Sequence, residues 1–482
     1  MTPAQQQLVD TNLERFGPKT VTTDPHAIEP WESDWRGRYH GRAPALLSPR
    51  STEEVAAIVR LAGELGVRIV PQGGNTGMVG GATPPEDGSA LLLSTRRMNH
   101  IRSVDTVGNL AVVEAGVILA NFHDAMAEQG RRFPLTLGAK GSATIGGLVS
   151  TNAGGTQVLR FGNMRHLVAG VEAVLPDGSI HEGLVPLKKD NRGYDLKQLL
   201  IGAEGPIGIV TAATLRLYPA IVERAAAWVG VADPEDALRI LRLTEARTAT
   251  IESFEIIPGE ILGHVLHHIP GTRSPLAGEH AWHVLIESVA TEPGAEPPAA
   301  LLERLLVPVF EAGLAEDAVI STSEAQVEAF WHIRDSISEA ERALGPAMQH
   351  DISVPVDKMP RFMLAAAAEA ERRFPGTRAT AFGHLGDGNV HFHVRAPQGA
   401  DRDAWYAGDG PAVSRLVYDM VVAEGGSISA EHGIGQMKRA ELERLSPPSR
   451  IAALKAIKSA LDPRGILNPG KLVALAPDAD TP

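Results

Sequence analysis

The sequence predicts an α+β protein with two main domains, and three observations lead to this fold class. The chain has 482 residues, which is enough for several domains at roughly 150 residues each. Its first part is dense in glycine and carries short β-branched strand patterns, but after Pro219 longer strand and helix patterns alternate. Glycine-containing motifs then return near Gly425. We therefore expect a first domain at residues 1–222, an antiparallel-sheet domain at 223–425, and a C-terminal segment at 426–482 that returns to the first domain.

The first domain is predicted to combine short strands with a few helices. Residues 52–66 have an amphipathic helix pattern, with Thr52 as N-cap and Gly66 as the stop. A hairpin is expected at 168–181, where two β-branched runs flank an Asp-Gly turn. The remaining patterns predict strands at 67–70, 91–94, 110–114 and 207–217, a helix at 117–129, and a glycine-rich segment at 138–155 with a helical centre.

The second domain shows the alternation of strands and helices more clearly. Strand patterns occupy 228–231, 251–257 and 283–287, and helix patterns occupy 233–246, 298–312 and 357–374. A β-sheet covered by helices follows from this alternation.

Composition and charge exclude several classes of protein. The net charge of −13 and the lack of a basic run argue against a nucleic-acid partner. The absence of cysteine excludes disulfides, thiolate metal sites and iron–sulfur clusters on this chain. Residues 1–18 show no apolar signal region, and no run of 18 apolar residues predicts a transmembrane segment. The expected location is the cytoplasm.

Three glycine-rich loops predict a long ligand bound against backbone. The first, at 70–81, follows a strand and reads VPQGGNTGMVGG; the second spans 138–155, and the third is GAEGPIG at 202–208. Exposed backbone N–H groups with Asn, Ser and Thr side chains suit a pyrophosphate, although the spacing is neither that of a Walker loop nor GxGxxG. A single loop of this kind could equally be a surface turn, but three of them favour a dinucleotide.

Taken as a set, PQGGNTG, GSATIGGLVSTNAGG and GAEGPIGIVT resemble the FAD-binding domain of vanillyl-alcohol oxidase-type (PCMH) flavoproteins. The resemblance covers about residues 30–475 and extends to the D-2-hydroxyacid dehydrogenase branch, with D-2-hydroxyglutarate dehydrogenases, D-lactate dehydrogenases and the glycolate oxidase D-subunit. It implies a two-subdomain FAD-binding domain, then a substrate (cap) domain with an antiparallel sheet, and a C-terminal segment packed on the FAD domain. The FAD contacts that it implies are Pro71, Gly73, Gly74, Asn75, Thr76, Gly77, Gly138, Ser142, Gly147, Ser150, Asn152, Gly154, Ile209 and, in the tail, Asn468.

We expect this FAD to be bound non-covalently. Relatives with a covalent tether use His or Cys, whereas residues 71–81 contain no His and the chain contains no Cys. One departure lies in the third loop, where Pro206 stands in place of the usual Thr and alters one backbone contact near the flavin.

A group of histidines around a turn predicts a metal site. In residues 389–394 two histidines, His391 and His393, alternate with three apolar residues, so a strand places both imidazoles on one face. The Gly-Asp-Gly-Asn turn before them folds His384 back toward His391. A third ligand from 429–435 would complete a catalytic-type Zn²⁺ set, against the alternative of ordinary core or loop imidazoles.

The resemblance assigns roles to this group. It implies His384, His391 and Glu431 as metal ligands and His432 as the base on the substrate hydroxyl. We expect a divalent metal, with Zn²⁺ ahead of Mn²⁺ or Fe²⁺ because these ligands are not unique to one metal.

Arg334 and Ser338 are spaced four residues apart, as on one helical face. A guanidinium there could clamp a substrate carboxylate, or it could form a surface ion pair with Asp335, Glu339 or another acid. The resemblance implies substrate binding by Arg334 and Ser338. It also implies substrate contacts at His432, at Gln349, where hydroxyglutarate dehydrogenases carry Lys, and at His393, where they carry Asn. These two departures put hydroxyglutarate in doubt as the substrate.

The expected reaction is the oxidation of a D-2-hydroxyacid to the 2-oxoacid, with hydride transfer to flavin N5. An external acceptor, which is an electron-transfer protein, a quinone or a dye, then reoxidises the flavin, and a homodimer is left open. Three alternatives remain at this point. They are a metal-free D-lactate or glycolate oxidase-type subunit, a metal-dependent hydrolase without flavin, and a non-catalytic flavin-binding partner.

Overall fold

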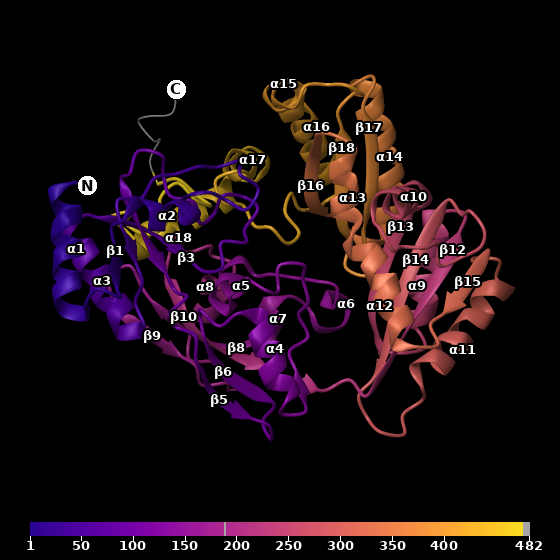
Figure 1. The fold of residues 1–482 in the computed structure, drawn as a ribbon, viewed down its shortest axis with the longest axis horizontal. Coiled ribbons are helices and arrows are strands. Elements are labelled where there is room, and N and C mark those ends of the chain that lie inside the picture. Colours follow the sequence, from indigo (N-terminus) through magenta and orange to yellow (C-terminus); the bar gives the residue numbers. More distant parts are fainter. Residues whose placement is uncertain (188, 476–482) are drawn as a thin grey trace. The chain divides into compact units, whose positions relative to one another are not determined.

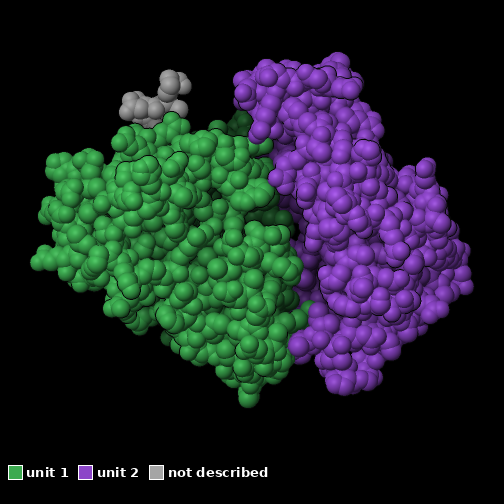
Figure 2. All heavy atoms as spheres, in the orientation of Figure 1, with its two compact units in different colours: residues 1–154, 163–218, 431–482 green, residues 155–162, 219–430 purple. Residues whose placement is uncertain are grey.

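A computed structural model describes residues 1–187 and 189–475, and the chain divides into two compact units (Figure 2). The first unit contains Met1–Gly154, Asn163–Tyr218 and the segment from Glu431 onward. The second contains Gly155–Gly162 and Pro219–Ala430. The unit limits lie a few residues from the domain limits predicted at 222 and 425. The predicted α+β class is confirmed, because each unit combines helices with β-sheet.

The first unit begins with a four-stranded sheet and the helices that cover it (Figure 1). The strand order is β1-β2-β4-β3, in which β2, β4 and β3 run parallel. Ser51, and not the predicted Thr52, caps the helix over this sheet, because its side chain accepts the Glu54 N–H at 3.3 Å. Gly66 ends that helix with a left-handed φ of 68°. The elements are α1 (Pro3–Phe16), β1 (Val21–Thr22), α2 (Pro25–Glu32), β2 (Leu46–Leu47), α3 (Thr52–Leu65), β3 (Arg68–Gln72) and β4 (Ala90–Ser94).

A five-stranded antiparallel sheet forms the other part of the first unit, with strand order β5-β6-β10-β8-β9. The expected hairpin at 168–181 is present as β8 and β9. The elements are β5 (Ile101–Asp105), β6 (Leu110–Glu114), α4 (Leu119–Ala127), β7 (Arg131–Arg132), α5 (Ile145–Thr151), α7 (Met164–Leu167), β8 (Val168–Val174), β9 (Ile180–Gly183), α8 (Leu196–Leu200), β10 (Ile209–Arg216) and β11 (Tyr218–Pro219).

The C-terminal segment returns to the first unit, as expected. It contains α17 (Arg439–Leu445) and α18 (Pro448–Leu461) and then reaches β3, where the Ile69 N–H donates to Ile466 O at 2.8 Å. Lys458 fixes α18 to the third glycine loop, because its Nζ donates to Pro206 O at 2.7 Å. The segment therefore brings Asn468 next to the glycine loops.

The second unit is built on a seven-stranded antiparallel sheet with the order β15-β12-β14-β13-β17-β18-β16. The strands are β12 (Glu223–Val231), β13 (Ile251–Pro258), β14 (Trp282–Ala290), β15 (Asp317–Ile320), β16 (Ala347–Ser353), β17 (Arg378–His384) and β18 (Asn389–Arg395). β12, β13 and β14 extend strand patterns recognised in the sequence, and β17 and β18 form the hairpin expected around His384 and His391. No strand was predicted in the stretches that form β15 and β16.

Helices cover both faces of this sheet (Figure 1). One layer contains α9 (Pro234–Glu245), α11 (Pro298–Glu311), α14 (Met359–Arg373) and α16 (Asp409–Ala423). The opposite layer contains α10 (Gly259–His268), α12 (Glu324–Asp335) and α13 (Ile337–Ala343), which enclose a buried core around Trp228 and Phe382. The shorter helices are α6 (Val158–Phe161), η1 (Val356–Lys358) and α15 (Arg402–Ala407). Across the described residues, no helix is both long enough and apolar enough to cross a bilayer.

Candidate functional site

The three glycine-rich loops lie against one another in the first unit. A Cβ added to Gly73 would come within 2.3 Å of Thr144 Oγ1, and one added to Gly74 within 2.1 Å of Ser142 O. The first loop therefore touches the second so closely that only glycine fits at both positions. The third loop joins them, because the Glu204 N–H donates to Ser150 O at 2.8 Å.

The polar groups along these loops fit a bound dinucleotide. Two buried oxygens, Thr144 Oγ1 and Asn468 Oδ1, have no hydrogen-bond partner among the described residues. Buried polar atoms are rarely left unpaired, so both oxygens suit a ligand that supplies donors. The Asn468 amide donates to Gly81 O at 3.0 Å and to Glu204 O at 2.7 Å, which holds its side chain between the first and third loops.

The residues predicted to contact FAD differ in exposure. Gly77, Gly138 and Ser142 are exposed, whereas Gly154, Ile209 and Asn468 are buried. Pro71, Gly73, Gly74, Asn75, Thr76, Gly147, Ser150 and Asn152 are half-buried. Ile209 lies in the apolar core of the unit, so its side chain is not part of the loop surface. The side chains of Asn75 and Asn152 already form hydrogen bonds within the protein. Asn75 Nδ2 donates to Ser33 O at 2.9 Å, and Asn152 Oδ1 accepts the Arg165 N–H at 2.9 Å.

Glu204 is a feature of the third loop that the sequence analysis did not single out. Its buried carboxylate accepts the backbone N–H of Ile434 at 2.7 Å and that of Gly435 at 2.6 Å. Burial raises the pKa of Glu204 even though these two hydrogen bonds favour its charged form. Glu204 thus fixes the turn that follows His432. Glu204 adopts a left-handed φ of 59° within this loop, between Gly202 and Gly205, and the sequence does not show this conformation.

In the second unit, the expected hairpin brings His384 close to His391. Strands β17 and β18 pair from Arg378 opposite Arg395 to His384 opposite Asn389. The ring centroids of His384 and His391 are 5.4 Å apart. Val390, Phe392 and Val394 are buried on the opposite face, where Phe392 packs against Phe362 of α14. The alternation seen in the sequence therefore separates an apolar face from a histidine face.

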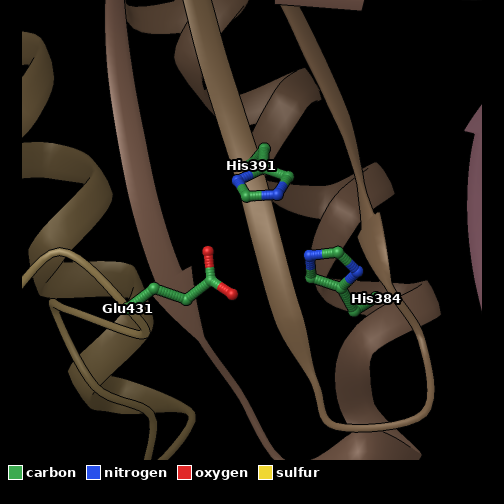
Figure 3. A group of neighbouring side chains, drawn as sticks. All are labelled: His384, His391 and Glu431. Atoms are coloured by element: carbon green, nitrogen blue, oxygen red, sulfur yellow. The ribbon is translucent and has the colours of Figure 1, made fainter. Parts of the chain in front are cut away.

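Glu431 completes a group that fits a metal ion (Figure 3). One potential ligand atom from each of His384, His391 and Glu431 lies within 4.8 Å of the others, and the carboxylate points toward the two rings. Two imidazoles and one carboxylate form a donor set typical of catalytic zinc. Burial, together with the nearby His384 and Arg334, lowers the pKa of His391 well below its usual value, so its ring is neutral and offers a lone pair.

Glu255 links this group to Arg334. Its Oε1 lies 2.6 Å from His384 Nδ1 and its Oε2 accepts Arg334 Nε at 2.6 Å. Burial alone would raise the pKa of Glu255, but Arg334 and His384 together hold it below its usual value. An ionised carboxylate only accepts, so His384 Nδ1 carries a proton toward Glu255, and Nε2 is the ring nitrogen left to face a metal. Glu255 was missed because a charged residue in a strand pattern gives no sign of its partner.

The structure corrects the pairing of Arg334 with Ser338. One helix, α12, ends at Asp335 and the next, α13, begins at Ile337, so no single helix carries both residues. Arg334 is buried and its partner is Glu255, whereas Ser338 is exposed. The break at Ser336 explains the difference, because the spacing rule for one helical face assumes a continuous helix.

The two positions that depart from the hydroxyglutarate pattern lie side by side. Gln349 of β16 is directly opposite His393 of β18, on the same sheet face as His391. His393 Nδ1 lies 3.3 Å from Glu341 Oε2, and Arg395 Nη2 donates to the other oxygen of Glu341 at 2.9 Å. His393 is thus held by an acid on α13.

His432 lies beside two carboxylates. Ligand atoms of His432, Glu431 and Asp351 form a second group within 4.8 Å of one another. This places an imidazole next to the proposed metal ligand Glu431, where it can accept a proton.

Comparisons with known proteins agree with this arrangement. Residues 43–183 match the FAD binding domain family, and residues 222–472 match the C-terminal domain family of FAD linked oxidases. The chain is 38% identical over 464 residues to a mitochondrial D-2-hydroxyglutarate dehydrogenase of Bos taurus, covering 96% of this chain and 82% of the relative. It is 36% identical to a D-2-hydroxyglutarate dehydrogenase of Xanthomonas citri, with 94% of each chain covered.

A solved structure shows the same fold at low identity. It is p-cresol methylhydroxylase with substrate bound, at a TM-score of 0.76 and 16% identity, with 98% of each chain covered.

Proposed function

The chain belongs to the family of FAD-linked oxidases that contains D-2-hydroxyglutarate dehydrogenases, and we propose that it is an FAD-dependent, metal-assisted D-2-hydroxyacid dehydrogenase. The single observation that carries the proposal is the convergence of His384, His391 and Glu431, with Arg334 joined to the same group through Glu255. An electrophilic site next to a buried guanidinium suits a substrate with adjacent hydroxyl and carboxylate groups.

The three glycine loops and Asn468 would hold FAD non-covalently, and FAD supplies the two-electron acceptor for the hydride. His384, His391 and Glu431 would hold a divalent metal, for which Zn²⁺ is the best match, and it would supply a Lewis acid next to the substrate hydroxyl.

The chain's own residues bind and orient the substrate. The Nε of Arg334 is engaged by Glu255, which leaves its terminal amino groups for the substrate carboxylate. His432 takes the hydroxyl proton as the hydrogen on C2 leaves with its electron pair, and the 2-oxoacid is the product. The electrons then pass to an external acceptor.

The distal part of the substrate would reach the row of the sheet next to His391. Gln349 and His393 occupy that row, so an amide and an imidazole meet the substrate there. Together, Gln349 and His393 offer hydrogen-bond donors and acceptors but no lysine charge. This pair favours a D-2-hydroxyacid with a polar distal group over a substrate that requires a lysine partner.

A visible absorption spectrum, metal analysis and a panel of D- and L-2-hydroxyacids test the proposal together. We expect flavin absorption that is removed by denaturation and filtration, a divalent metal close to one per chain, and bleaching by at least one D-acid. Protein without flavin would instead indicate the metal-dependent hydrolase. Fully active protein without metal would indicate the lactate- or glycolate-type flavoprotein, and flavin that no hydroxyacid bleaches would indicate a non-catalytic partner.

A further inference from the structure

We propose that Glu255 is a positioning residue that serves the substrate-binding arginine and a metal-ligating histidine with one shared carboxylate. Metal retention and substrate binding then depend on the same side chain. This inference rests on the proposed function, in which Arg334 binds the substrate carboxylate and His384 binds the metal.

The geometry gives each carboxylate oxygen its own partner. Glu255 Oε1 lies 2.6 Å from His384 Nδ1, and Oε2 lies 2.6 Å from Arg334 Nε. Glu255 is completely buried, so no water competes for either oxygen. The backbone sets the first contact, because Glu255 of β13 is paired directly with His384 of β17.

Each partner is oriented by this contact. A hydrogen bond from Nδ1 fixes the ring of His384 and its tautomer, which leaves Nε2 to face the metal. A hydrogen bond from Nε fixes Arg334 with its guanidinium carbon 5.6 Å from the centre of the Phe382 ring. The same ring lies 5.2 Å from that of His391, so Arg334 and both histidines share one packed group.

Substitution of Glu255 removes both effects at once. Glutamine offers one acceptor oxygen and one donor nitrogen, so Glu255→Gln cannot accept from Arg334 and His384 together. It also leaves the Arg334 guanidinium buried without its counter-charge. Glu255→Asp keeps the charge but is one methylene shorter, so it restores one of the two contacts at most.

The same strand offers a matched control. Glu252 is also fully buried on β13 and also forms an ion pair, with Arg160 Nη1 at 2.6 Å. Its partner lies on α6 and is not a residue of the proposed site. Glu252→Gln therefore repeats the loss of a buried charge in the same strand without touching Arg334 or His384.

The experiment compares FAD-loaded wild type, Glu255→Gln, Glu255→Asp and Glu252→Gln. Zinc content is measured after dialysis against a series of buffered free Zn²⁺ concentrations, and kcat and KM are measured with the best D-2-hydroxyacid. We expect Glu255→Gln to lower zinc affinity by about 10- to 100-fold, as for other groups that orient a metal ligand. Its KM should rise by at least about tenfold, with FAD content unchanged. Glu255→Asp should recover part of the loss, and Glu252→Gln should match the wild type in both measurements.

Two results would overturn the shared role. One is a Glu255→Gln protein whose zinc affinity and KM both match those of Glu252→Gln. The other is a change in only one of the two quantities, since Glu255 would then serve a single partner. Wild type that neither retains nor needs zinc would contradict the proposed metal site itself, and this is seen before any variant is compared.

A further pair of variants covers failure of Glu255→Gln to fold. Arg334→Met combined with Glu255→Gln removes the uncompensated cation, so its fold is expected to be retained. Its zinc affinity should still fall, whereas Arg334→Met alone should keep zinc. Equal zinc retention by these two proteins would contradict the proposal.

Discussion

At the residue scale, the chemistry of the site depends on a few buried charges that hold one another. Glu255 lies between Arg334 and His384, and Glu204 holds the backbone just after His432. None of these contacts follows from residue spacing, because their partners are separated in the sequence by 79 to 231 residues. Sequence reasoning found the histidines and Arg334 from motifs but not the acids that orient them.

His384→Ala should remove the metal and leave the flavin in place. His384 is a proposed ligand in the second unit, whereas the glycine loops are in the first. We expect yellow protein with less than one metal per chain and kcat lowered by at least about 100-fold, above the loss usual for an orienting group. His267→Ala, on the exposed side of α10, is the control and should match the wild type. Full turnover by His384→Ala would refute the metal role.

Arg334→Lys should weaken substrate binding more than it slows the reaction. Lysine keeps the charge but loses the planar fork that binds a carboxylate with two hydrogen bonds. Charge-assisted hydrogen bonds contribute about 1.5–3 kcal/mol, so we expect KM to rise by about 10- to 100-fold with a smaller change in kcat. Steady-state kinetics measure both values, and Arg242→Lys on exposed α9 is the control. An unchanged KM would mean that Arg334 is only a structural partner of Glu255.

At the scale of elements, the glycine loops and the central sheet of the second unit show how local sequence rules succeed and fail. The loops are recognisable because close backbone approach requires glycine, and that requirement is written in the sequence. The break between α12 and α13 cannot be recognised from the sequence. Ser336 ends α12 and precedes α13 while its own dihedral angles stay in the right-handed helical region, so no glycine or proline marks the break.

Gly74→Ala should reduce FAD binding. A Cβ at this position would lie 2.1 Å from the backbone oxygen of Ser142, so the first and second loops must separate. We expect FAD affinity to fall by at least about tenfold, which is about 1.4 kcal/mol. Fluorescence titration of the apoprotein with FAD measures this change.

The control for Gly74→Ala is a glycine in open space. Gly263 lies on the exposed side of α10 and has no atom within 4 Å of an added Cβ. Gly263→Ala should leave FAD affinity unchanged and stabilise the helix by about 0.4–1 kcal/mol. Equal FAD binding by Gly74→Ala and Gly263→Ala would contradict the role of the loop contact.

Glu287 of β14 should make stability depend on pH. Burial raises its pKa from 4.5 to about 7, although Trp331 Nε1 donates to it at 2.5 Å. The folded state therefore favours the protonated form. The contribution of Glu287 is fully present below pH 4.5 and is lost as the pH rises through 7.

The measurement is urea unfolding at pH 5 and pH 8. Glu287→Gln mimics the neutral form and does not titrate. From pH 5 to pH 8, the free energy of unfolding of the wild type should therefore fall by about 2 kcal/mol relative to that of Glu287→Gln. Glu303→Gln on the exposed side of α11 should follow the wild type. A constant difference between Glu287→Gln and the wild type would show that Glu287 titrates normally.

At the scale of the whole molecule, the residues of the proposed chemistry are distributed over both compact units. The first contains the three glycine loops, Asn468, Glu431 and His432, and the second contains the histidine hairpin, Arg334 and Glu255. The α+β class and the returning C-terminal segment could be predicted because composition changes along the chain and because the motifs recur at both ends. That residues 155–162 belong to the second unit could not be predicted from the sequence, because it depends on packing such as the Arg160–Glu252 ion pair.

The most direct test of the account is anaerobic reduction of the flavin by a D-2-hydroxyacid in metal-loaded, metal-stripped and zinc-reloaded protein. We predict rapid bleaching of the loaded protein by the D-acid but not by its L-enantiomer. Stripped protein should stay yellow and bleach at least about 100-fold more slowly, and added zinc should restore the rate. Equally fast bleaching with and without metal would contradict the account.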